Sequence, residues 1–177
     1  MSGDTFASDR ASSLGGGIFV NSSFGLKVVN STFATSVHGG IVSIGGGGEV
    51  TFSTFSATEL GGLEIHLSNS ILLSVECILN VSDENLNLQF GSTGCPNSIP
   101  TANPDVDPSR FLMNNGGLTP TIALLPSSPA IGAIPNADCT DQEGNRVTTD
   151  QRGFPRPGSG PGGPCTVGAF EFQGPVP

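Results

Sequence analysis

The sequence is poor in the side chains that proteins use to bind nucleic acids. It has no Trp and no Tyr, and six basic residues stand against 15 acidic ones, which gives a net charge of −9. Nucleic-acid surfaces need basic side chains that contact phosphates, and often aromatic rings on which bases stack. We therefore expect no nucleic-acid partner. The same acidity disfavours an anionic membrane surface.

Long apolar stretches are also missing. No run approaches the roughly 18 apolar residues of a membrane-spanning helix, so we predict no membrane insertion. The first ten residues, MSGDTFASDR, have neither the basic start nor the apolar core of a signal peptide. Either any export signal lies outside this sequence, or the protein is not exported.

A helical hydrophobic period is absent as well, whereas a glycine-bracketed repeat is present. GGIFV at 16–20 recurs as GGIVS at 39–43, and VVNSTF at 28–33 recurs as VTFSTF at 50–55, while LSNSIL at 67–72 is a third copy at shorter spacing. Apolar and polar residues alternate within each copy, as they do in strands. Units of about 22 residues, made of short strands with Gly or Asn turns, are typical of a parallel β-solenoid.

Such a fold places equivalent positions of successive coils directly above one another. One apolar column is expected from Phe33, Phe55 and Leu72, and a second from Val28, Val50 and Leu67. An antiparallel β-sandwich is the alternative. It would explain the alternation of apolar and polar residues, but not a repeat that stays in phase.

The repeat divides the chain into three parts of one structural unit. Residues 1–14 resemble the ragged edge of a preceding coil, so the chain is expected to be the end of a longer solenoid. Residues 15–90 are expected to form the coils. Residues 91–177 are rich in Pro, Gly and Asn and are expected to form loop-rich last coils and a cap over the open end, with strands at 118–125 and 167–172.

The four cysteines show no metal-binding spacing and favour disulfides. Four cysteines allow three pairings. We favour the sequential one, Cys77 with Cys95 and Cys139 with Cys165, because each pair brackets one irregular segment. Reduced, buried cysteines are the alternative.

Three segments of the C-terminal half carry a family resemblance. VDPSRFLMNNGGLTPTIALLPSSPAIGA at 106–133, TDQRGFPRP at 149–157 and CTVGAFEF at 165–172 follow one another in this order. Together they resemble the C-terminal part of the choice-of-anchor Q proteins, and the similarity extends from about Gly15 to Phe172. The resemblance implies a right-handed parallel β-helix on an exported bacterial protein, with no established catalytic activity. We therefore predict an all-β fold, a right-handed parallel β-helix (solenoid) of few coils with an irregular C-terminal cap.

No set of residues forms a convincing catalytic centre, so no catalytic residue is predicted. The acids of the regular part (Glu49, Glu59, Glu64 and Glu76) do not recur at one position of the repeat, as a carboxylate pair of a glycosidase would. A lyase would need a Lys or Arg base near clustered acids, and Lys27 is the only lysine. His38 and His66 occupy different positions of the repeat, without a nucleophile in a recognisable setting.

The remaining charged residues are expected to be structural. Asp150 and Arg152 are predicted to clamp the backbone of the cap through charged hydrogen bonds. DCTDQEGN at 138–145 lacks the alternating acids of a calcium loop. We therefore predict no cofactor, with a structural calcium ion at Asp138, Asp141, Glu143 and Asp150 as the alternative.

These observations predict a non-enzymatic structural or adhesive segment of a secreted or cell-surface protein. Its partner is expected to be a surface protein or a glycan, although the absence of Trp and Tyr disfavours a dedicated sugar groove. The alternative is a carbohydrate-active module of the polysaccharide lyase or glycosidase type, or a glycan-binding one.

Overall fold

The structure is a computed structural model that describes residues 1–13, 15–36 and 38–174. In these residues it contains strands β1 to β11 and two short 3-10 helices, η1 (Pro108–Arg110) and η2 (Asn136–Asp138), but no α-helix. Each pairing between named strands is parallel. The prediction of an all-β chain with parallel strands is confirmed, and the antiparallel sandwich is excluded.

The strands form two sheets. The first contains, in spatial order, β1 (Thr5–Ala7), β4 (Thr32–Ala34), β7 (Thr54–Ser56), β9 (Ile71–Leu73) and β11 (Leu88–Phe90). The second contains β2 (Ile18–Val20), β5 (Ile41–Ser43), β8 (Glu59–Ser68), β6 (Gly48–Thr51) and β3 (Leu26–Val29), and β10 (Glu76–Asn85) also pairs with β8. The first part of β8 pairs with β5 and the last part with β6, so the second sheet is strongly curled.

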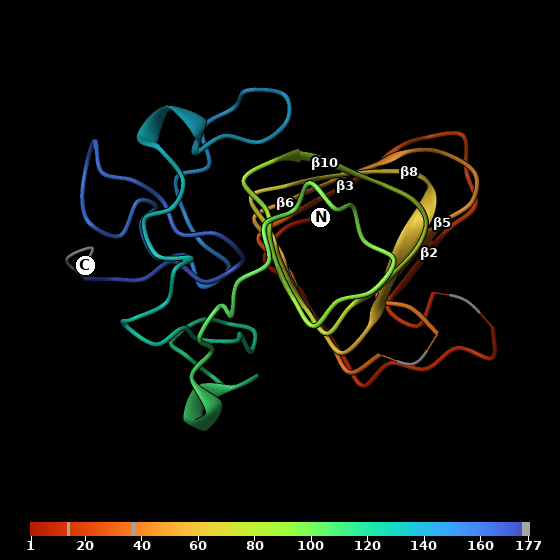
Figure 1. Ribbon diagram of the computed structural model, residues 1–177, viewed down its shortest axis with the longest axis horizontal. Helices are drawn as coiled ribbons and strands as arrows, with labels where there is room; N and C mark the ends of the chain where they lie inside the picture. The colour runs from red at the N-terminus through yellow and green to blue at the C-terminus, as the bar shows by residue number, and fades with distance from the viewer. Residues whose placement is uncertain (14, 37, 175–177) are drawn as a thin grey trace.

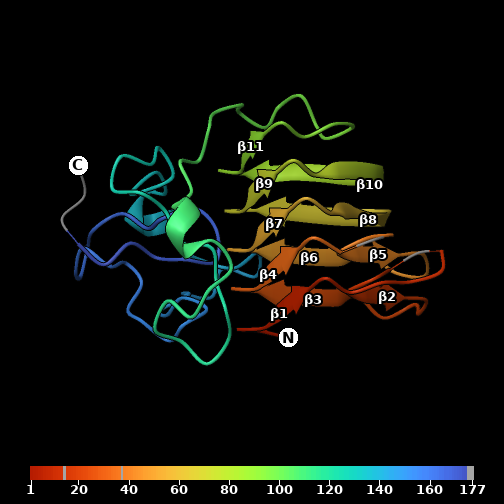
Figure 2. The same cartoon turned by 90° about the horizontal axis from the view of Figure 1, so that it is seen from below.

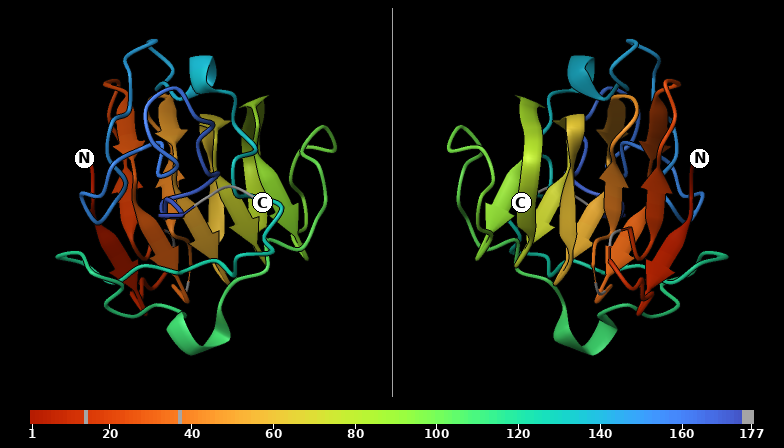
Figure 3. Two further views of the ribbon diagram at one scale, coloured as in Figure 1. Left: turned by 90° about the vertical axis from the view of Figure 1, so that its left-hand side faces the viewer. Right: turned by 90° about the vertical axis from the view of Figure 1, so that its right-hand side faces the viewer.

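The chain alternates between the two sheets, which enclose the core. Viewed along the stack, the strands trace a triangular outline (Figure 1). Side views show successive layers, from β1, β2 and β3 at one end to β11 at the other (Figures 2 and 3).

Equivalent apolar side chains lie above one another inside this outline. The register pairs Phe6 with Phe33, Phe33 with Phe55, and Phe55 with Leu72. The ring centroids are 4.9 Å apart for Phe6 and Phe33 and 4.8 Å apart for Phe33 and Phe55. A second column joins residues that are all fully buried, namely Val28, Val50 and Leu67.

The turns beside the five-stranded sheet use left-handed backbone at residues other than glycine. The φ angle lies between 49° and 53° at one set of equivalent corner positions, Asn30, Phe52, Asn69 and Leu86. Such angles cost roughly 1–2 kcal/mol for a residue with a side chain. Hydrogen bonds to the next layer hold them, such as that from Asn69 N to Asn85 O at 2.9 Å.

The repeated glycines serve both at turns and between layers, since Gly39 has the positive φ of 106° expected of a turn glycine. A Cβ on Gly17 would lie 2.5 Å from the carbonyl oxygen of Gly40, the equivalent glycine of the next layer. The repeated Gly pair therefore allows two backbones to approach closely.

The last layer is closed by the segment that follows β11. Thr93 bridges to Glu76, and the Cys77–Cys95 disulfide ties this segment to β10. Ile99 is 1% exposed and packs into the core that contains Phe33 and Phe55. Residues 91–100 thus cover one end of the stack.

The rest of the C-terminal half differs from the expected end cap. It lies alongside the five-stranded sheet instead of beyond its last strand (Figure 2). Gln151 accepts a hydrogen bond from Thr32 Oγ1 at 2.6 Å, and Ala169 N donates to Thr54 Oγ1 at 3.0 Å. A second apolar core fills the space between them and includes Phe52, Ile71 and Phe170.

The strands expected at 118–125 and 167–172 do not form. Only isolated bridges involve this region, such as the one that joins Met113 to Thr121. Side chains form hydrogen bonds with backbone groups there instead of neighbouring strands. Asn115 donates to the carbonyl oxygen of Thr121, and Asp150 accepts from the backbone N–H of Glu171. In the part of the chain that the structure describes, no helix has the length and apolar character needed to cross a membrane.

Candidate functional site

A polar concave surface lies on the outer face of the curled sheet. A groove of about 380 Å³ is bounded by β6, β8 and β10 on one side and by residues 138–142 on the other. A second groove, of about 330 Å³, continues it across β3 and shares Glu49 and His66 with the first. We call the two together the polar groove.

The parallel register aligns the outward side chains of this face. Lys27 pairs with Glu49, Glu49 with His66, and His66 with Ser82. These residues alternate with the inward column of Val28, Val50 and Leu67. A row of charged and polar groups therefore crosses the strands along the floor of the groove.

His66 is the centre of a hydrogen-bonded cluster within this row. Its Nδ1 lies 2.7 Å from Glu84 Oε1 and 3.0 Å from Ser82 Oγ, and its Nε2 lies 3.6 Å from Glu64 Oε1. The hydrogen bond to Glu84 raises the pKa of His66, against an opposing effect of burial. The same bond lowers the pKa of Glu84.

Ser82 is the hydroxyl of the cluster. Its Oγ lies 2.7 Å from Glu84 Oε1, 3.0 Å from His66 Nδ1 and 3.3 Å from the carbonyl oxygen of Ile65, so three acceptors are within reach of its single proton. Nothing in the sequence relates Ser82 to His66, because the two are neighbours only through the register of β8 and β10. His38, by contrast, is exposed at a left-handed turn.

The other wall of the groove is tied to the sheet by Lys27. Its Nζ lies 2.9 Å from Asp141 Oδ2 and 2.8 Å from Glu143 Oε2. Hydrogen bonds to Glu143 and Asp141 raise the pKa of Lys27. Burial acts to raise the pKa of Asp141, but hydrogen bonds from Lys27 and Asn145 outweigh it and lower that pKa.

Two of the acids considered for calcium, Asp141 and Glu143, are used in these contacts. Asp141 Oδ1 also accepts hydrogen bonds from the backbone N–H groups of Glu143 and Asn145, and thereby closes the turn. Asp150 pairs with Arg152 elsewhere. Among residues 1–13, 15–36 and 38–174, no group of three or more His, Cys, Asp or Glu side chains is arranged to hold a metal ion.

One acidic pair does share a position of the repeat, contrary to the sequence analysis. Glu59 and Glu76 are partners in the register of β8 and β10. Like charges opposed across two strands destabilise a sheet slightly. The pair lies outside the polar groove.

Asp150 and Arg152 form the clamp expected of them. Arg152 Nη2 lies 2.7 Å from Asp150 Oδ2, and both side chains are almost fully buried. Arg152 also donates to the backbone oxygens of Asn115 and Glu171. These bonds join three segments of the C-terminal half.

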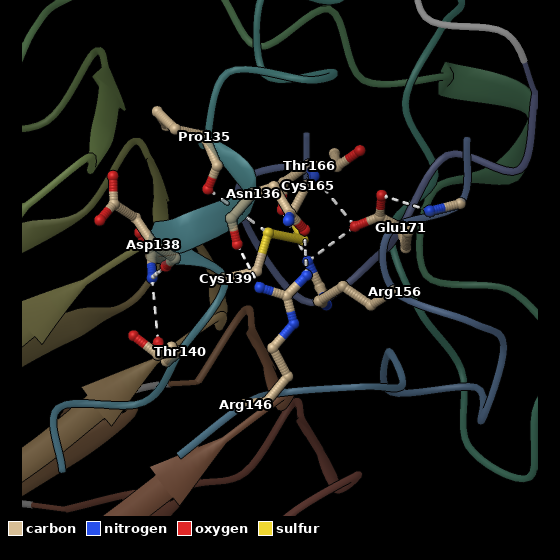
Figure 4. The surroundings of a disulfide bond; sticks show 12 residues. Pro135, Asn136, Asp138, Cys139, Thr140, Arg146, Arg156, Cys165, Thr166 and Glu171 are labelled. Atoms are coloured by element: carbon tan, nitrogen blue, oxygen red, sulfur yellow. Dashed lines mark hydrogen bonds and ion pairs between the residues drawn. A yellow bond between two sulfur atoms is a disulfide. The ribbon is translucent and has the colours of Figure 1, made fainter. Parts of the chain in front are cut away.

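A second buried ion pair was not anticipated from the sequence. Arg156 Nη1 lies 2.9 Å from Glu171 Oε2, beside the Cys139–Cys165 disulfide (Figure 4). Burial lowers the pKa of Arg156 to about 10 and raises the pKa of Glu171. The only signal in the sequence was a lone acid between Phe170 and Phe172.

These contacts assign most charged groups of the C-terminal half to structure. In the polar groove, by contrast, the side chains of Glu84 and Glu143 are 44% and 58% exposed. No protein-family model, curated protein or solved structure was found to match this chain.

Proposed function

We propose that the chain is a right-handed parallel β-helix segment and serves as a structural or adhesive part of a secreted or cell-surface protein. The observation that carries this proposal is the in-register stacking of Phe6, Phe33, Phe55 and Leu72. Repeated side chains that contact only the layers above and below give a stiff, quasi-one-dimensional framework. Such a framework can extend by further coils and present loops to a surface protein or a glycan.

Export is supported by the cysteines. The two disulfides, Cys77–Cys95 and Cys139–Cys165, use every cysteine of the chain. Disulfides of this kind persist in oxidising compartments. The resemblance of the tail to choice-of-anchor Q proteins points to the same location.

A carbohydrate-active module is the second candidate, and the polar groove favours it. His66 between Glu64 and Glu84 could transfer protons to a substrate in the groove. The absence of Trp and Tyr from the sequence counts against this candidate.

Turnover assays separate the two functions. The purified chain is incubated with a panel of acidic and neutral polysaccharides, and new reducing ends and unsaturated sugars are measured. A scaffold releases neither. Turnover that disappears in a His66→Ala variant of unchanged thermal stability would establish the enzyme instead.

A further inference from the structure

We propose that the polar groove binds an extended, Lys- or Arg-rich segment of a partner protein. This inference rests on the adhesive function proposed above and assigns the class of partner to one surface. It is built on the shape of the sheet face, its charge and its unsatisfied acceptors.

The shape fits an extended chain. Residues 138 and 140–143 line the groove beside the outer face of β3, β6, β8 and β10. Four strands at about 4.8 Å spacing span about 14 Å. An extended peptide covers that length with four or five residues at about 3.3 Å each.

The charge of the groove is negative on both walls. Carboxylates come from β6 and β10 on one side and from the loop on the other, namely Glu49, Glu84, Asp138, Asp141 and Glu143. The two basic side chains, Lys27 and His66, are already paired with Asp141, Glu143 and Glu84. In the part of the chain that the structure describes, the carboxylates of Glu49 and Asp138 form no hydrogen bond or ion pair.

Asn69, which lines the groove, has a buried acceptor without a hydrogen-bond partner among the described residues. The residue is 4% exposed. Its Nδ2 donates to the carbonyl oxygens of Asp138 and Thr140, whereas its Oδ1 has no partner among the described residues. Buried acceptors without a donor are rare and costly, and an ammonium or guanidinium group offers several donors.

Other ligand classes fit less well. A divalent cation would need three or more clustered ligands, which the described residues do not offer. A glycan usually packs on an aromatic plane, and the sequence has neither Trp nor Tyr. A basic, extended polypeptide uses both the carboxylates and the length of the groove.

The test uses a fluorescent hexalysine peptide and measures its binding to the full chain by anisotropy at low salt. The variant Glu49→Gln/Asp138→Asn removes the two unpaired carboxylates and is expected to weaken binding by about five- to tenfold. The matched control Glu59→Gln/Glu76→Gln removes the same charge outside the groove and is expected to change binding by less than about twofold. Thermal unfolding of both variants establishes that they fold.

Three results would overturn the proposal. They are no binding of hexalysine, equal weakening in the groove and control variants, and displacement of the peptide by micromolar Ca²⁺ or by a neutral oligosaccharide. Failure here leaves the scaffold function intact, because that function is tested by polysaccharide turnover and by the stacking of the core.

Discussion

At the scale of single residues, buried charged side chains fix the C-terminal half to the sheets. The Asp150–Arg152 pair is separated by two positions in TDQRG, so the sequence was enough to predict it. Arg156 and Glu171 are 15 positions apart, within segments that have no periodicity, and nothing in the sequence pairs them. Gln151 reaches Thr32 and the backbone of Asp4 across more than 100 residues, and it was missed for the same reason.

Glu171→Gln is expected to lower the free energy of unfolding by about 3 kcal/mol, because it leaves Arg156 charged and unpaired in the interior. Glu171 also accepts hydrogen bonds from the backbone N–H groups of Gly158 and Thr166. Urea unfolding followed by circular dichroism measures the loss. Glu76→Gln, at an exposed position, is the control and is expected to change stability by less than about 0.5 kcal/mol. Equal stability of the two variants would contradict the role given to the pair.

The His66–Glu84 pair makes stability depend on pH. The pKa of His66 is raised above 6.5 in the folded state, so its contribution is complete below that pH and is lost as the pH rises through the raised value. The pKa of Glu84 is lowered from 4.5, so its contribution is present above pH 4.5 and is lost as the pH falls through the lowered value. We expect the midpoint of thermal unfolding to fall slightly as the pH rises above 6.5.

Imidazole resonances followed by NMR give the pKa of His66 directly. We expect the pKa of His66 to lie above 6.5 in the wild type and to be lower in the Glu84→Gln variant. An unchanged value in that variant would remove the physical basis of the prediction.

At the scale of strands, the repeat was the informative part of the sequence. Two features, the Gly pair and the NSTF-like segment, recur in phase, and the register of β4, β7 and β9 aligns the same residues. The corners were less predictable, because Phe52 and Leu86 adopt left-handed backbone that their side chains disfavour. Hydrogen bonds between layers impose that conformation, and no local pattern signals it.

Phe55→Ala is expected to lower the free energy of unfolding by about 3–5 kcal/mol, because it opens a cavity between Phe33 and Leu72 in the middle of the column. Phe24, which is 82% exposed, provides the control. Phe24→Ala is expected to stay within about 0.5 kcal/mol of the wild type. Chemical denaturation measures both variants, and similar losses would speak against a packed column.

At the scale of the whole molecule, the C-terminal half lies beside the stack of layers instead of beyond it. The sequence indicated loops, cysteines and polar clamps there, but not which surface they cover. That placement depends on contacts between Asn30, Thr54 or Asn69 and residues more than 65 positions away. The polar groove exists only because of it, since residues 138–142 form one wall.

Replacing Cys139 and Cys165 by Ala is expected to lower the free energy of unfolding by about 3.5 kcal/mol, the chain-entropy value for a loop of this length. Hydrogen exchange should then rise first in residues 101–174, with β4, β7 and β9 retaining protection. The Cys77→Ala/Cys95→Ala variant is the comparison, and its exchange should rise near residues 91–100. If both variants lost protection uniformly along the chain, residues 101–174 would not be held to the sheets independently of the strands.

The distance between the rings of Phe33 and Phe55 is the most direct test of the stacked framework. With phenylalanine selectively labelled, nuclear Overhauser effects report which rings touch. We predict strong cross-peaks between Phe33 and Phe55, between Phe6 and Phe33, and from Phe55 to the methyl groups of Leu72. Separate environments for Phe33 and Phe55, with no cross-peak between them, would contradict the stacked framework and the function proposed for it.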